Sequence, residues 1–122
     1  MYTFLTIEDL GNLPEPKWMI EGLFEQDALV MLVGPPGSFK SFLAIDWALS
    51  LATGRPWNER SVKPSRVLYC LGEGKASLLK RIQAWVHHAE LSIEEQTLLN
   101  ANFRTTFNVP QLALWKETIN FT

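Results

Sequence analysis

The sequence is poor in cysteine and has no long apolar run, and each absence excludes a class of protein. A single cysteine, Cys70, among 122 residues excludes an internal disulfide framework and fits a reducing compartment. No apolar stretch reaches the roughly 18 residues that a membrane-spanning helix needs. The N-terminus has no basic segment followed by an apolar run, which a secretion signal would have. We therefore expect a cytoplasmic protein that does not enter a membrane.

An excess of charge of one sign is also missing. The chain has 11 Lys and Arg against 13 Asp and Glu, a formal net charge of −2. This balance argues against a basic protein that coats nucleic acid. The hydrophobic fraction of 47% and the charged fraction of 20% are typical of globular proteins. A chain of this length has room for one domain, and no repeat or linker divides it.

Short apolar runs alternate with helical patterns along the chain. Residues 1–27 form an irregular lead-in with a short helical candidate at 6–10, and residues 28–122 carry the regular pattern. The expected order is strand 28–33, helix 40–52, strand 66–71, helix 76–90, a helical stretch 92–99, strand 103–107 and helix 110–119. Gly54 is a C-terminal cap candidate, and Ser92 with Glu95 forms a capping box. This order predicts an α/β fold with a mainly parallel sheet flanked by helices.

The segment VMLVGPPGSFKSF, residues 30–42, matches the phosphate-loop pattern G-x-x-x-x-G-K-[ST] except at one position. Such a loop turns backbone N–H groups toward the phosphates, and Gly34 and Gly37 permit that curvature. Lys40 and Ser41 stand where a lysine bridges the outer phosphates and a hydroxyl binds magnesium. The expected strand before the loop and helix after it supply the context that the motif requires.

Phe39 is the departure from the pattern, since it stands directly before the lysine. A residue with a Cβ is strained at positive φ, so the local backbone angle decides whether this loop is under strain. Two roles remain open for the ring: a tolerated substitution, or packing on an apolar neighbour that positions the loop. The bland alternative is that Gly-Pro-Pro-Gly is only a turn, with Lys40 and Ser41 beginning an ordinary helix.

Four tracts together resemble a known family: residues 18–23 (WMIEGL), 34–41 (GPPGSFKS), 48–57 (ALSLATGRPW) and 67–74 (VLYCLGEG). They resemble the RepA-like branch of RecA-type ATPases, which are hexameric helicase-like proteins of plasmids and phages. The likeness covers about residues 17–82, and a GPPGSFKS loop looks like a variant tolerated within that group. It implies a RecA-like P-loop fold for residues 28–122, ATP with Mg²⁺ as cofactors, a homohexamer and action on single-stranded DNA.

The resemblance also assigns site residues. Glu73 follows the second expected strand, where a RecA-type ATPase places the glutamate that orients the attacking water. Its alternative role is a solvated acid near a helix start. Lys40 is the second expected catalytic residue, and Ser41 the expected metal ligand. The residues expected to bind nucleotide are Gly34, Pro35, Pro36, Gly37, Ser38, Phe39, Lys40, Ser41 and Phe42. Lys80 and Arg81 are interpreted as a solvated helix face, with an intersubunit surface as the alternative.

One expected element is missing. The resemblance implies a Walker B aspartate at the end of a later apolar strand, but Asp46 is the last aspartate in the sequence. Two interpretations remain: an incomplete RecA-like domain, or a short nucleotide-binding protein that does not hydrolyse ATP. The leading prediction is the ATP-hydrolysing module of a DNA replication or recombination motor. The alternatives are a non-hydrolysing regulatory or assembly module and a small-molecule kinase, which the lack of an arginine-rich lid disfavours.

Overall fold

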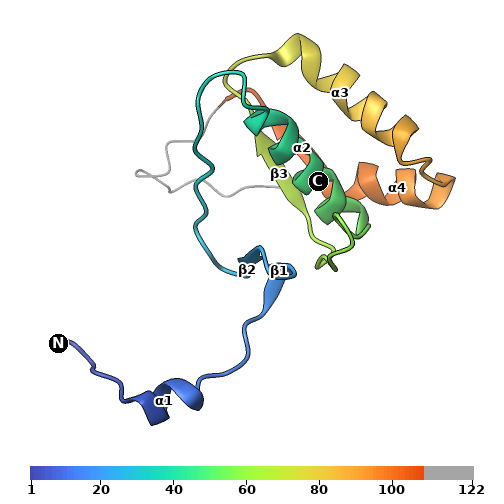
Figure 1. Cartoon of the computed structure of the whole chain (residues 1–122). Helices are drawn as coiled ribbons and strands as arrows, with labels where there is room; N and C mark the ends of the chain where they lie inside the picture. The colour runs from blue at the N-terminus through green and yellow to red at the C-terminus, as the bar shows by residue number, and fades with distance from the viewer. Residues whose placement is uncertain (109–122) are drawn as a thin grey trace.

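The computed structural model describes residues 1–108, so the helix expected at 110–119 lies outside the described part. Its helices are α1 (Ile7–Gly11), α2 (Lys40–Thr53), α3 (Lys75–His88) and α4 (Ile93–Asn102). Its strands are β1 (Trp18–Ile20), β2 (Phe24–Glu25), β3 (Val67–Cys70) and β4 (Phe103–Thr106). The N-terminal arm with α1 extends away from a body made of α2, α3, α4, β3 and β4 (Figure 1). No helix among these residues is long and apolar enough to cross a bilayer.

Helix α2 is the centre of the body. One of its faces, Ile45, Leu49 and Ala52, recurs at helical spacing and is buried. These residues form one core cluster with Leu78 of α3 and Leu99 of α4. The helix ends at Gly54, whose φ of 77° is left-handed and whose N–H donates to the Ser50 carbonyl. The predicted helix and its glycine cap are therefore confirmed.

The other side of α2 is covered by aromatic residues. The Trp47 ring meets Phe24 of β2 and Trp57 edge to face, with centroids 5.6 Å and 5.9 Å away. The Asp46 carboxylate accepts one hydrogen bond from Trp57 Nε1 and one from Trp85 Nε1, each 2.7 Å long. Helix α2 therefore contacts neighbours on more than one face. Asp46 thus ties α2 both to the loop before β3 and to α3.

Strands β3 and β4 pair in parallel, in the register Val67 to Phe103 through Cys70 to Thr106. This pairing confirms the second and third expected strands, and the whole is a mixed α/β fold with a small parallel sheet. The hairpin β1–β2 is a separate antiparallel pair that the sequence did not predict. Cys70, the last residue of β3, is a free and exposed cysteine.

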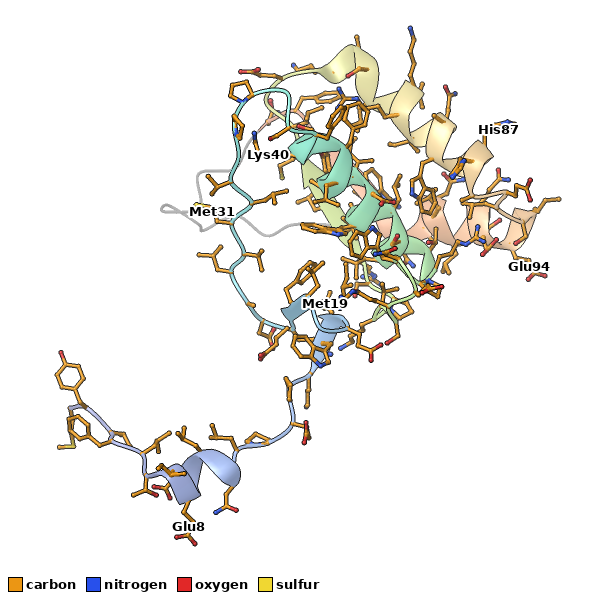
Figure 2. The ribbon with its side chains drawn as sticks, viewed as in Figure 1. Glu8, Met19, Met31, Lys40, His87 and Glu94 are labelled. Carbon is orange, nitrogen blue, oxygen red and sulfur yellow. The ribbon has the colours of Figure 1, made fainter. Side chains whose placement is uncertain are left out.

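The strand predicted at residues 28–33 is wrong for this structure. The segment runs unpaired between β2 and α2, and Leu29, Met31 and Val33 are 99%, 83% and 78% exposed (Figure 2). A strand needs a neighbour that satisfies its backbone N–H and C=O groups. Within residues 1–108, β3 and β4 pair with each other and no third strand lies beside the segment. The apolar run has the composition of a buried strand but lacks a partner here.

Candidate phosphate-binding site

The phosphate loop closes around the lysine side chain. Lys40 Nζ donates to the carbonyl oxygens of Gly34 at 2.6 Å and Pro35 at 2.9 Å, and contacts Ser38 Oγ at 3.3 Å. Ser38 Oγ in turn donates to the Pro35 carbonyl at 2.6 Å. A Cβ on Gly34 would lie 2.8 Å from Ser38 Oγ, so a larger residue there would displace the Ser38 hydroxyl. The ammonium group is therefore held at the N-terminal end of α2 (Figure 2).

The backbone of Phe39 is strained, which answers the question about its local backbone angle that the sequence left open. Its φ and ψ are 62° and 21°, which is the left-handed region that favours glycine. Phe39 is 72% exposed, and its ring packs at a tilt on Phe42, with centroids 5.8 Å apart. The Phe39 ring thus contacts an apolar neighbour, and such packing is one of the two roles that the sequence left open for it. Gly37, two residues earlier, also has positive φ, 77°.

The two helices that begin at the site lack side-chain caps. Helix α2 has no capping side chain and no acidic residue in its first turn, and α3 begins after Gly74 in the same uncapped way. Helices α1 and α4 instead carry complete capping boxes, one of which is the predicted Ser92–Glu95 pair. The first-turn N–H groups of a helix have no partner within it, and its dipole favours an anion there. The start of α2 is therefore open to an anion such as phosphate.

Most of the predicted residues line two adjoining cavities, whereas Gly34 and Pro35 line neither of them. The first has a volume of about 340 Å³ and is lined by Pro36, Gly37, Ser38, Phe39, Lys40, Ser41, Phe42 and Arg81. The second, of about 220 Å³, joins Ser41 of α2 to Glu73, in the loop after β3. The fold thus gathers the loop, the hydroxyl and the candidate acid, although they are 32 residues apart from Ser41 to Glu73 in the sequence.

Arg81 is a site residue that sequence reasoning assigned to a solvated helix face. It lines both cavities, and its guanidinium carbon lies 4.3 Å from the centre of the Phe42 ring. The signal that could have found it is helical spacing: Ser77 and Arg81 lie one turn apart on α3 and face the same cavity as Glu73. A second cation therefore stands beside Lys40.

Among known protein families, a model described as an AAA domain matches residues 2–118 of this chain. The chain belongs to the AAA domain family. No curated protein and no solved structure matches it. The family is one of AAA-type P-loop ATPases, so this AAA domain is an ATPase-type nucleotide-binding module, and ATP, typically with Mg²⁺, is the ligand that the family implies.

The residues at the loop of this AAA domain fit a magnesium nucleotide. Mg²⁺ in such sites takes few protein ligands and completes its shell with phosphate oxygens and water. Ser41 offers the hydroxyl, and Glu73 lies across the same cavity. Residues 1–108 contain no group of three or more His, Cys, Asp or Glu side chains that could hold a metal alone. Asp46 lines neither of the two loop cavities, and its oxygens accept hydrogen bonds from two indoles.

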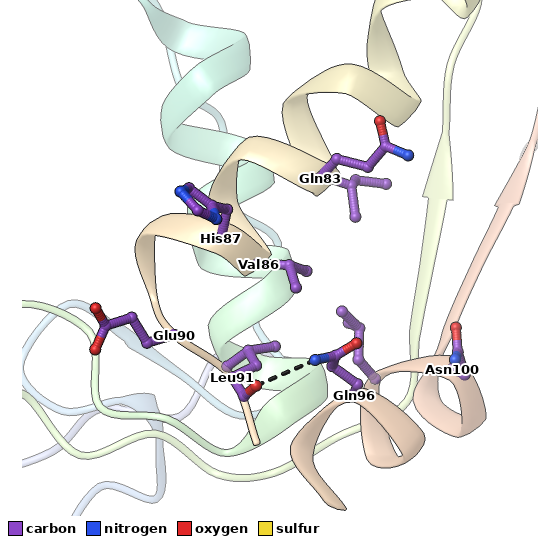
Figure 3. A pocket seen from close by; sticks show the side chains of 9 residues that line it. Gln83, Val86, His87, Glu90, Leu91, Gln96 and Asn100 are labelled. Carbon is purple, nitrogen blue, oxygen red and sulfur yellow. Dashed lines mark hydrogen bonds between the residues drawn. The ribbon is translucent and has the colours of Figure 1, made fainter. Parts of the chain in front are cut away.

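A further cavity of about 560 Å³ lies between α3 and α4, and no residue of the phosphate loop lines it. Figure 3 shows its polar lining, with Gln83, His87 and Glu90 on one side and Asn100 on the other. Two of its lining residues are joined by a hydrogen bond, from Gln96 Nε2 to the Leu91 carbonyl at 3.1 Å. The elements of a phosphate site are therefore concentrated at α2 and the start of α3.

Proposed function

We propose that this AAA domain binds Mg·ATP on the loop Gly34–Ser41 and hydrolyses it with Glu73 as the residue that activates water. The observation that carries the proposal is the meeting of Lys40, Ser41 and Glu73 at the open start of α2. The Lys40 ammonium donates to two acceptors without formal charge, the carbonyl oxygens of Gly34 and Pro35. Phosphate oxygens carry full charge and would compete well for it.

The chemistry of these residues follows from their positions. Lys40 would bind the outer phosphates, and the first-turn N–H groups of α2 would support the charge that develops there. Ser41 would hold Mg²⁺, which supplies charge neutralisation at the phosphates. Glu73 would accept a hydrogen bond from water beside the γ-phosphate and take its proton as the water oxygen attacks phosphorus, leaving ADP and inorganic phosphate. The exposed carboxylate is available for this role.

The biological role that we propose is that of a motor or loader on single-stranded DNA in replication or recombination, assembled as a homohexamer. Its support is the resemblance of four tracts to the RepA-like branch of RecA-type ATPases. The net charge does not support DNA binding, since the chain is slightly acidic. The test is whether single-stranded DNA accelerates phosphate release, with duplex DNA as the comparison.

A second candidate is a nucleotide-binding module that does not turn ATP over. The observation that favours it is the state of Asp46, the last aspartate in the sequence. Its two oxygens are bound by Trp57 and Trp85. Among the described residues, Glu73 is the one acidic side chain that lines the two phosphate-loop cavities.

The deciding experiment combines isothermal titration with phosphate release on Lys40→Ala and Glu73→Gln. Lys40→Ala should weaken ATP binding at least tenfold, about 1.4 kcal/mol, and Glu73→Gln should bind normally and not hydrolyse. The matched controls are Lys17→Ala and Glu94→Gln, which change the same residue types on exposed surface away from the loop. Unchanged affinity in Lys40→Ala would refute the phosphate site. Hydrolysis that survives Glu73→Gln would refute the role of Glu73, and binding without any wild-type turnover would favour the second candidate.

A further inference from the structure

A cavity beside the phosphate loop lies between α2 and α3, and it is larger than the two cavities described at the loop. It has a volume of about 760 Å³, which is within the usual range for small-molecule sites. Its lining includes Phe39, Phe42, Arg81 and Trp85. It shares Ser38, Phe39, Phe42 and Arg81 with the cavity of the loop itself. The two cavities therefore adjoin, with these four residues common to both.

The shared residues present flat faces. The Phe39 and Phe42 rings are 72% and 51% exposed, with centroids 5.8 Å apart and planes inclined by 53°. The Arg81 guanidinium lies over the Phe42 ring. Exposed aromatic rings beside a planar cation are the chemistry that binds a nucleobase by stacking.

The backbone of Phe39 adds a separate argument. A left-handed residue with a Cβ is strained, and glycine at this position would remove the strain. Strained residues persist where the surrounding structure or a function requires them, and they cluster at ligand sites. The ring contributes little to the core, because most of it is exposed. Contact with a bound ligand is a use for the ring that its packing does not provide.

We propose that the cavity between α2 and α3 binds the base of the nucleotide, with the base stacked on Phe39 or Phe42 and Arg81 on its edge or opposite face. This inference rests on the proposed phosphate site, because it places the base of the same nucleotide in the neighbouring cavity. Stacking depends on ring area more than on hydrogen-bond pattern, so purines should bind better than pyrimidines and ATP and GTP should bind comparably.

The test compares ATP with inorganic tripolyphosphate, which has the phosphates but no base. Wild type should bind ATP at least tenfold more tightly than tripolyphosphate under the same Mg²⁺ concentration. Phe39→Leu and Phe42→Leu, which keep the apolar volume but remove the ring, should each weaken ATP binding about fivefold or more. Both should weaken tripolyphosphate binding clearly less than they weaken ATP binding. Leu79→Ala, which removes an exposed apolar side chain from α3 outside the cavity, is the control and should change neither.

A spectroscopic measurement checks the stacking itself. The fluorescence of 2-aminopurine riboside triphosphate should be quenched on binding to wild type and to Phe42→Tyr, and recover in the Phe39→Leu Phe42→Leu double variant. Equal losses of ATP and tripolyphosphate affinity, or no loss in either leucine variant, would overturn the base site. The phosphate proposal fails separately, if Lys40→Ala binds both ligands as well as wild type does.

Discussion

Asp46 should be among the most sensitive positions of the body for stability. Its carboxylate accepts two hydrogen bonds of 2.7 Å, from Trp57 before β3 and from Trp85 on α3. A hydrogen bond to a charged group contributes about 1.5–3 kcal/mol. Because these groups are only part-buried, we take the lower half of the range for each. Asp46→Ala should therefore lower the free energy of unfolding by about 3 kcal/mol, a large fraction of the usual total.

The assay is chemical denaturation of wild type, Asp46→Ala, Trp85→Phe and the double variant, followed by far-UV circular dichroism. Trp85→Phe should cost less in the Asp46→Ala background than in wild type, by about 1 kcal/mol or more, because the acceptor is already gone. Trp47→Phe is the matched control, since Trp47 Nε1 is buried and has no hydrogen-bond partner among the described residues. Additive effects of Asp46→Ala and Trp85→Phe would refute the reasoning.

Three further outcomes follow from the loop and from α4. Phe39→Gly should have a free energy of unfolding about 1 kcal/mol higher than that of Phe39→Ala, because both variants lose the ring but only glycine relaxes the left-handed backbone. Equal denaturation midpoints for the two variants would contradict the strain. Gly34→Ala should weaken nucleotide binding with little change in unfolding, because its Cβ would displace Ser38 Oγ, 2.8 Å away, in an exposed loop; titration calorimetry measures this, and wild-type affinity would count against it. The Ser92 N–H bond lowers the pKa of Glu95, so its cap on α4 should stabilise the protein above the unfolded pKa and be lost as pH falls through the lower folded value. Wild type and Glu95→Gln should therefore converge in thermal stability on acidification, and a constant difference between them would oppose this reasoning.

Local signals in the sequence gave the elements that depend on neighbours along the chain. The helix predicted at 40–52 is observed as Lys40–Thr53, and its cap Gly54 has the left-handed φ that glycine tolerates. The capping box of Ser92 and Glu95 is present with both hydrogen bonds. The phosphate-loop pattern could be recognised because its glycines, lysine and serine lie within eight residues, and the nucleotide site that it indicates stays a prediction. Its family assignment at the level of an AAA domain agrees with that pattern.

Tertiary structure decided what depends on partners distant in sequence. The run at 28–33 has the composition of a buried strand, yet composition cannot supply the neighbouring strand that would satisfy its backbone. The β1–β2 hairpin was missed because its strands are only three and two residues long and carry no alternation to detect. Arg81 reaches the loop only because Leu78, on the same helix, packs into the core beside α2. Asp46 joins two indoles 11 and 39 residues away, a meeting that no local pattern encodes, since only the packing of α3 against α2 brings the second donor within reach.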